Sequence, residues 1–130
     1  MILIDTSAWI EFLRNTGSPV CIRVDELLGT DLATCDPVRM ELLAGARDER
    51  NLDDLRRLLA RATTLTAGPA DYEAAAALYR QCRSRGETVH KMIDCLIAAI
   101  AVRSDIAILH QDTDFEVLAR HTALRTSDPG

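Results

Sequence analysis

The chain has 130 residues, of which 48% are hydrophobic and 27% charged, and its formal net charge at pH 7 is −5. This length and balance predict one folded domain with a single hydrophobic core and no disordered region. No segment has the roughly 18 uncharged apolar residues of a membrane span, and the opening MILID lacks the pattern of a secretion signal, so we expect a soluble cytoplasmic protein.

Strand-like apolar runs and helical periodicity alternate along the whole chain. The run 1–4 predicts a buried strand that leads directly into a helix, and Ser18-Pro19 and Asp36-Pro37 mark the starts of two further helices. In chain order, strands are expected over 1–4, 31–35, 63–67 and 106–110, and helices over 5–14, 18–29, 36–47, 51–62, 68–86, 87–105 and 111–121. This pattern predicts a three-layer α/β/α sandwich with a mainly parallel sheet.

Two features of the composition bear on function. The cysteines have no Cys-x-x-Cys spacing and no histidine partner at zinc-finger spacing, so buried reduced thiols are expected at Cys21, Cys35, Cys82 and Cys95. The acidic net charge argues against a nucleic-acid partner, but only weakly, because acids gathered in a metal site no longer count as free surface charge. All basic residues except Lys91 are arginines, and spacing does not rank those that could line a substrate groove: Arg14, Arg39, Arg47 and Arg103.

Carboxylates stand close to the ends of the expected strands. Asp5 closes the first strand and Asp112 comes just after the fourth, while Glu41 lies on the helix that follows the second. Open α/β sheets place their functional sites at the carboxyl ends of parallel strands. Each of these acids also has a plain structural role open to it, as a helix cap, a turn residue or the edge of an apolar stripe.

Of these acids, Asp94 is the one that a purely structural role explains least well. It lies in KMIDCLIAAIAV, residues 91–102, where all other residues after Met92 are apolar, and a helix that is hydrophobic all round is buried. Ionised carboxylates are almost never fully buried unless they are paired or bound to a metal. The alternative is a single buried ion pair, with Arg103 or Arg39 as the partner.

Several acids at one sheet edge need a counter-charge. Two unit charges about 4 Å apart cost on the order of 4 kcal/mol at an effective dielectric near 20. Because no basic residue is interleaved among these acidic motifs, we expect a divalent cation, and an all-oxygen set of carboxylates and water favours Mg²⁺ or Mn²⁺ over Zn²⁺. Carboxylate-bound Mg²⁺ characteristically acts on phosphates.

Four motifs, LIDTSAWIEFL, VRMELLAG, DCLIAAIAV and HQDTDFEVLA, resemble in order and spacing those of the PIN-domain ribonucleases. In size the chain resembles the VapC-type toxins of bacterial toxin–antitoxin pairs, and the resemblance covers nearly the whole chain. It implies one PIN-like domain over 1–130 that acts as a metal-dependent endoribonuclease toxin, cuts structured RNA such as tRNA or rRNA, and inhibits translation. It also implies neutralisation by a cognate VapB-type antitoxin, whose tail enters the acidic site, and a homodimer.

The resemblance further assigns individual residues. The family's acidic quartet, which would hold one or two Mg²⁺ or Mn²⁺ ions and the attacking water, falls on Asp5, Glu41, Asp94 and Asp112. Asp114 matches an acid of auxiliary role. Thr6 matches a hydroxyl residue that orients the water or the substrate phosphate, and a simple helix-start hydroxyl explains it equally well. No catalytic role is expected for the histidines His90, His110 and His121.

Two other functions stay open at this point. A phosphatase of the haloacid-dehalogenase type also begins with an apolar strand that ends in Asp and also uses Mg²⁺. It requires a second Asp two residues later, where this chain has Ser7. The other is a non-catalytic PIN-fold module that binds a partner or RNA, and the complete set of acids argues against it.

Overall fold

The structure is a computed structural model that describes residues 1–129. Within this range four strands and seven helices alternate, in the order that the sequence predicts. They are β1 (Ile2–Ile4), α1 (Thr6–Leu13), α2 (Pro19–Leu27), β2 (Leu32–Cys35), α3 (Asp36–Ala44), α4 (Glu49–Leu59), β3 (Thr63–Leu65), α5 (Pro69–Ser84), α6 (Met92–Ser104), β4 (Ala107–Leu109) and α7 (Thr113–His121). None of the helices described is long and apolar enough to cross a membrane.

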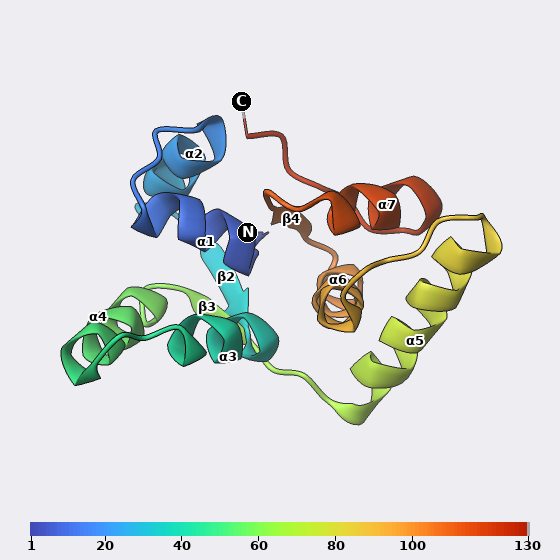
Figure 1. Cartoon of the computed structure of the whole chain (residues 1–130), viewed down its shortest axis with the longest axis horizontal. Helices are drawn as coiled ribbons and strands as arrows, with labels where there is room; N and C mark the ends of the chain where they lie inside the picture. The colour runs from blue at the N-terminus through green and yellow to red at the C-terminus, as the bar shows by residue number, and fades with distance from the viewer. Residues whose placement is uncertain (130) are drawn as a thin grey trace.

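The strands form one parallel sheet in the order β3-β2-β1-β4. β1 is central, and its Leu3 lies opposite Ala33 of β2 and Ile108 of β4. Helices cover both sides of the sheet (Figure 1), which confirms the predicted α/β/α sandwich and explains why β1, β2 and β4 are mostly apolar and buried. Because all pairings are parallel, the carboxyl ends of the strands meet at one edge.

The hydrophobic core is built around α6, in which every residue from Asp94 to Ala101 is buried. α5 packs against α6 (Figure 1), and the two are joined by Arg103, whose Nε donates to Asp71 Oδ1 at 2.8 Å and whose Nη2 donates to Asp71 Oδ2 at 3.1 Å. This pairing lowers the pKa of Asp71. The alternative in which Arg103 pairs with Asp94 is therefore wrong, and Arg39 takes part in no ion pair found within residues 1–129.

The sequence predicted that the helix carrying Asp94 begins at residue 87. In the structure this helix begins at Met92. The backbone N–H groups of His90 and Lys91 each donate to the Asp114 carboxylate, at 3.0 Å. These bonds to α7 hold the segment before α6 in a non-helical conformation, with Lys91 at φ −120° and ψ 119°. A contact between segments that are distant in the chain therefore sets this helix boundary.

The four cysteines are buried and form no disulfide, as expected. Burial raises the pKa of the Cys35 thiol to about 12 and that of Cys95 to about 12. Because metal binding requires the thiolate, these protonated thiols make poor metal ligands.

The burial of α6 predicts unequal effects of two truncations on the same helix. Ile100 is fully buried and Val102 is 36% exposed. We expect Ile100→Ala to lower the free energy of unfolding by about 2–5 kcal/mol, because it leaves a cavity. Val102→Ala should cost less than about 1 kcal/mol. Urea denaturation of both variants measures the difference, and equal losses would contradict this packing.

Candidate metal centre

β1 places Asp5 at the carboxyl edge of the sheet. Asp5 directly follows β1, and its N–H donates to Leu109 O of β4 at 3.0 Å. Asp5 Oδ2 caps α1 by accepting the Ser7 N–H at 3.0 Å and the Ser7 hydroxyl at 2.5 Å. Asp5 Oδ1 is buried and accepts no hydrogen bond from the described residues. The structural role of a helix cap thus uses one oxygen and leaves the other to the site.

Asp94 reaches the same edge from the first turn of α6 and is 2% exposed. Burial raises its pKa to about 8, and the hydrogen bond to Asp114 and the negative charges of Asp5 and Asp112 act in the same direction. Like Asp5, Asp94 has one buried oxygen, Oδ2, for which the described chain supplies no hydrogen bond. Below about pH 8, Asp94 therefore retains a proton that a bound cation would displace.

The loop after β4 supplies two acids with different surroundings. Asp112 is the N-cap of α7: its Oδ1 accepts the Asp114 N–H at 2.9 Å, and its Oδ2 accepts Lys91 Nζ at 2.6 Å. Asp114 is 1% exposed, and both its oxygens accept backbone N–H groups, from His90 and Lys91. Burial opposes its ionisation, but these bonds and the one to Asp94 outweigh it and lower the pKa of Asp114. Asp114 is thus the ionised anchor of the segment before α6.

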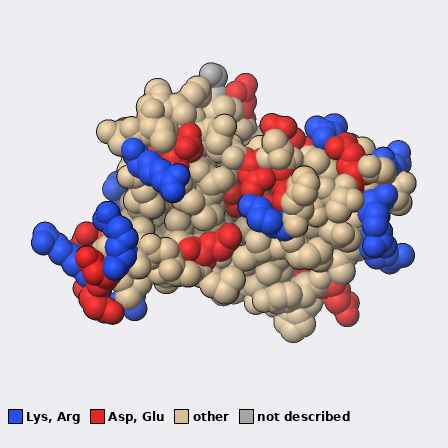
Figure 2. All heavy atoms as spheres, in the orientation of Figure 1, with Lys and Arg blue, Asp and Glu red and all other residues tan. Residues whose placement is uncertain are grey.

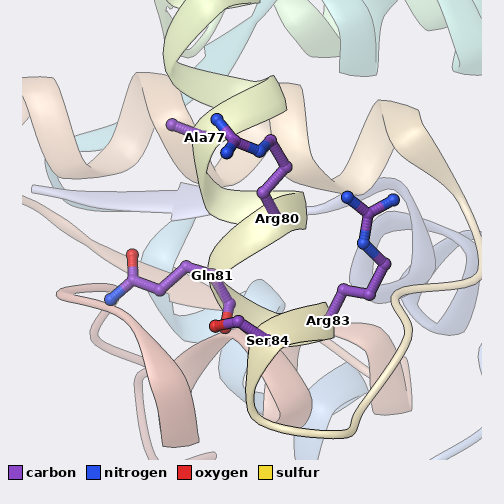
Figure 3. A pocket seen from close by; sticks show the side chains of 5 residues that line it. All are labelled: Ala77, Arg80, Gln81, Arg83 and Ser84. Carbon is purple, nitrogen blue, oxygen red and sulfur yellow. The ribbon is translucent and has the colours of Figure 1, made fainter.

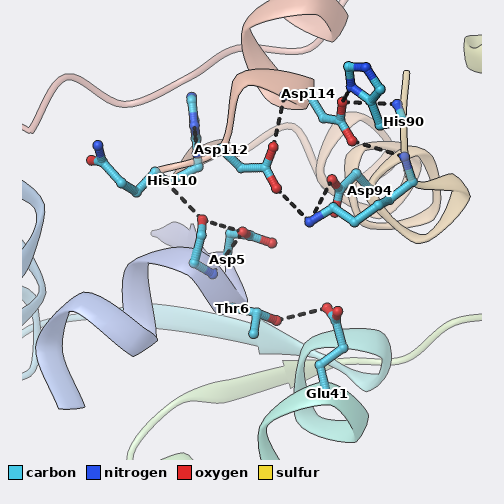
Figure 4. Close-up of polar contacts among 11 residues, drawn as sticks. Asp5, Thr6, Glu41, His90, Asp94, His110, Asp112 and Asp114 are labelled. Carbon is cyan, nitrogen blue, oxygen red and sulfur yellow. Dashed lines mark hydrogen bonds and ion pairs between the residues drawn. The ribbon is translucent and has the colours of Figure 1, made fainter. Parts of the chain in front are cut away.

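Carboxylate oxygens of Asp94, Asp112 and Asp114 lie within 4.8 Å of one another, the one acidic trio of this kind in the part of the chain that the structure describes. Asp5 adjoins the trio, since its charge raises the pKa of Asp94. Glu41 faces Asp5 from α3, where its Oε1 accepts the Thr6 hydroxyl at 2.9 Å (Figure 4). Burial raises the pKa of Asp5, and the charge of Glu41 raises it further.

The predicted quartet is therefore arranged in two parts around Asp5. Asp94 and Asp112 lie on one side of it, and Glu41, held by Thr6, lies on the other (Figure 4). Buried polar atoms normally find a partner, so the unpaired oxygens of Asp5 and Asp94 suit a ligand that accepts electron pairs. The donors of this site are carboxylate oxygens, and these fit a hard divalent cation.

Although no basic residue was found interleaved among the acidic motifs in sequence, one lies among these acids in the structure. Lys91 Nζ is 2.6 Å from Asp112 Oδ2 and 3.6 Å from Asp94 Oδ2. Lys91 and Asp94 are three residues apart, a spacing at which side chains on a helix meet. That spacing was the signal in the sequence that would have identified Lys91 as a neighbour of the acids.

Ser7 is a second residue of the site that the sequence did not reveal. Its hydroxyl donates to Asp5 and accepts the Gln111 N–H at 2.9 Å, across 104 positions of sequence. It therefore fixes the Asp5 carboxylate relative to the loop that carries Asp112. His110 supports the same loop, because its Nδ1 accepts the Asp112 N–H at 3.1 Å.

The surface around the site is acidic. Figure 2 shows acidic side chains gathered near the centre of this face, with a basic group against them and most other basic side chains toward its two ends. A separate hollow of about 390 Å³ on α5 is lined by Arg80 and Arg83 and holds no carboxylate (Figure 3). Its composition does not suit a divalent cation, so the carboxyl edge of the sheet is the candidate metal centre.

The raised pKa of Asp94 predicts how stability depends on pH in EDTA. Between its ordinary pKa of 3.8 and about 8, the folded protein holds a proton on Asp94 that the unfolded chain releases. The free energy of unfolding therefore falls as pH rises through this window, by up to about 1.4 kcal/mol per pH unit. Asp94→Asn removes this titration, so its Tm should fall less than that of the wild type between about pH 5.5 and about 7.5.

Asp105→Asn is the matched control for this experiment, because the Asp105 side chain is 94% exposed. We expect this variant to follow the wild-type pH profile. Parallel profiles for the wild type and Asp94→Asn would contradict a raised pKa of Asp94.

Comparison with known proteins identifies the family. The family model described as PIN domain matches residues 2–121, which include every acid of the site. Ribonuclease VapC11 of Mycobacterium tuberculosis and VapC ribonuclease Mb1587 of Mycobacterium bovis are each 46% identical to the chain over 131 residues, which is 98% of this chain and 98% of each relative.

Solved structures share the fold at lower identity. The DNA-bound VapBC of Salmonella typhimurium matches with a TM-score of 0.79 and 20% identity, over 99% of this chain and 98% of that chain. VapC20 of Mycobacterium tuberculosis, a Sarcin-Ricin loop cleaving toxin, matches with a TM-score of 0.67 and 21% identity, over 96% of this chain and 99% of that chain. With the family match and the VapC relatives, the conclusion is that the chain belongs to the PIN domain family and, within it, to the VapC proteins.

Proposed function

We propose that the chain is the toxin of a toxin–antitoxin pair, a cytoplasmic endoribonuclease that depends on Mg²⁺ or Mn²⁺, cuts structured RNA such as tRNA or rRNA, and inhibits translation. The observation that carries this proposal is the pair of buried carboxylate oxygens, Asp5 Oδ1 and Asp94 Oδ2, that no donor of residues 1–129 satisfies. Membership in the VapC proteins supports the reaction, since the two relatives with 46% identity are named ribonucleases.

The proposed ligands of one or two ions are Asp5, Glu41, Asp94 and Asp112. Asp5, Asp94 and Asp112 lie together and suit one ion, while Glu41 on the other side of Asp5 is available to a second. A Mg²⁺ or Mn²⁺ ion held by these residues would activate water as the nucleophile and would shield the phosphoryl oxygens of the RNA. Attack of this water in line on a phosphodiester would break the bond between phosphorus and the 3′ oxygen, which leaves as the 3′-hydroxyl, and would produce a 5′-phosphate.

Other residues hold these ligands in place. Thr6 orients Glu41, Ser7 orients Asp5, and Asp114 fixes the start of α6 through two backbone N–H groups. Both oxygens of Asp114 are already engaged, so we assign it a supporting role. His110 is half-buried, which lowers its pKa, and its Nδ1 is occupied by the Asp112 N–H. We therefore assign no general-base histidine, and the carboxylates orient the attacking water.

A groove of about 400 Å³ adjoins the site and supports binding of two partners. It begins at Thr6 and Glu41, its walls include the apolar Ile10 and Leu13, and two arginines line it, Arg14 and Arg47. We propose that these arginines contact RNA phosphates. The sequence also left Arg39 and Arg103 open as groove residues. Arg103 is bonded to Asp71, and Arg39 does not line the groove.

The same groove is our proposed docking surface for a VapB-type antitoxin. Its apolar wall suits a hydrophobic segment of the antitoxin, and the acids at its end suit a basic tail. An antitoxin bound there covers the RNA site and thereby blocks cleavage. The homodimer remains a proposal, and exposed apolar side chains of the first half of the chain, such as Ile22 and Met40, are available to it.

The phosphatase alternative is not favoured. That mechanism needs a second Asp two residues after Asp5, and the residue there, Ser7, is engaged with Asp5 Oδ2 and the Gln111 N–H. The non-catalytic alternative is not favoured either, because the site retains its full set of acids.

Ribonuclease activity is tested with purified protein, freed of antitoxin, and total bacterial RNA in Mg²⁺ or Mn²⁺. We expect discrete cuts that EDTA abolishes. Loss of a residue that only supports a metal ligand typically lowers activity roughly 10–100-fold. Asp94→Asn should lower the cleavage rate by more than this, because it removes a ligand itself. Mapping the 5′ ends identifies the substrate and the 5′-phosphate. The exposed Asp105→Asn serves as control and should cut like the wild type.

The wild type could leave the RNA intact and still bind a divalent metal that Asp94→Asn does not bind. This result would support the metal site but reject the ribonuclease assignment for that RNA pool. An aspartyl-phosphate on Asp5 would instead support the phosphatase.

The docking surface predicts separable effects on inhibition and catalysis. Leu13 is 45% exposed in the groove, so Leu13→Glu places a charge against the apolar segment of the antitoxin. We expect the antitoxin to bind this variant at least about tenfold more weakly, while RNA cleavage without antitoxin falls by a smaller factor, because the new charge lies beside Arg14 and Arg47. Tyr72→Glu on α5, where Tyr72 is 60% exposed, is the control and should remain inhibited. Full inhibition of Leu13→Glu by the antitoxin would place the docking surface elsewhere.

A further inference from the structure

Lys91 is the single lysine of a chain with 15 basic residues, and it lies at the acidic site. Its ammonium nitrogen is 2.6 Å from Asp112 Oδ2 and 3.6 Å from Asp94 Oδ2. A lysine ammonium is a compact, strongly hydrated point charge on a flexible stem, whereas the guanidinium of arginine is a broad planar fork. Of the two basic side chains, lysine is the one that can replace a small hydrated cation.

We propose that the Lys91 ammonium is a tethered counter-ion that takes the place of a divalent cation between Asp112 and Asp94, and that metal binding is an exchange in which this ammonium leaves. The inference rests on the proposed metal site and adds to it the residue against which the metal competes.

The hydrogen bonds of Asp112 show why the two cations compete. Asp112 Oδ1 accepts the Asp114 N–H as the cap of α7, whereas no backbone N–H of residues 1–129 donates to Oδ2. Lys91 Nζ is bonded to that same oxygen. It also lies near Asp94 Oδ2, the buried oxygen for which no hydrogen-bond donor is present in residues 1–129. A divalent cation bound to both oxygens would meet the ammonium at close range and repel it.

The surroundings of Lys91 allow it to leave without disturbing the fold. Its backbone N–H is fixed by Asp114 Oδ2 at 3.0 Å, independently of its side chain. The side chain itself is 53% exposed, so the ammonium can turn into solvent, where water replaces the hydrogen bond it loses. The exchange thus moves a side chain and leaves the start of α6 in place.

The first test compares Mn²⁺ affinity by calorimetry in the wild type and in Lys91→Met, which keeps the backbone bond but removes the charge. We expect Lys91→Met to bind Mn²⁺ about tenfold more tightly or better, which corresponds to about 1.4 kcal/mol. In EDTA its Tm should be lower than that of the wild type, because the acids lose their counter-ion. Arg50→Met, which removes an exposed charge from α4, controls for net charge and should leave Mn²⁺ affinity unchanged.

The second test uses the wild-type protein and therefore does not depend on how a variant folds. With lysine labelled at the ε carbon, the chain gives one side-chain NMR signal. Added Mg²⁺ should move this signal toward its position in urea-unfolded protein, as the ammonium leaves the carboxylates. The same addition to Asp94→Asn should have a much smaller effect.

The possible failures are distinguishable. If the wild type binds no Mn²⁺, the proposed metal site itself is rejected. If the wild type binds Mn²⁺ but Lys91→Met binds it equally or more weakly, or if the lysine signal does not respond to saturating Mg²⁺, the exchange is overturned and the metal site is retained.

Discussion

Repulsion among carboxylates at the carboxyl edge of a parallel sheet is the constraint on which the rest of this structure depends. Each acid relieves that repulsion in a different way. Asp94 keeps a proton, and Asp114 is ionised but bonded to two backbone N–H groups. Asp112 is paired with the ammonium of Lys91, and Asp5 is bonded through one oxygen to Ser7. The proton and the ammonium are the parts of this arrangement that a metal ion can displace, whereas the backbone and Ser7 bonds belong to the permanent framework.

The hydrophobic core makes this electrostatic problem more severe. Because α6 is buried along most of its length, water cannot solvate Asp94, and the charge must be cancelled locally. The apolar helix thus presents a buried carboxylate whose pKa is strongly raised, a feature that is common at functional sites.

Much of this organisation could be predicted from the sequence. Apolar runs and helical spacing gave the order of the elements and the parallel sheet, and an isolated acid in an apolar helix singled out Asp94. What escaped prediction depends on contacts between distant segments. The start of α6 is set by Asp114, 23 and 24 positions away, and the orientation of Asp5 is fixed through Ser7 by Gln111, 104 positions from Ser7. Local periodicity contains no information on such hydrogen bonds. Lys91 is the exception, because its spacing from Asp94 was visible in the sequence.

The parallel pairing of β1 with β4 also determines when the site is completed during synthesis of the chain. β1 is synthesised first, but its neighbour β4 and the loop that carries Asp112 follow only after α6. During translation, a growing chain therefore contains Asp5 and Glu41 without the acids that complete the site. The order of strands in the sheet therefore means that the full set of acids comes together only after β4 has been made and has paired with β1.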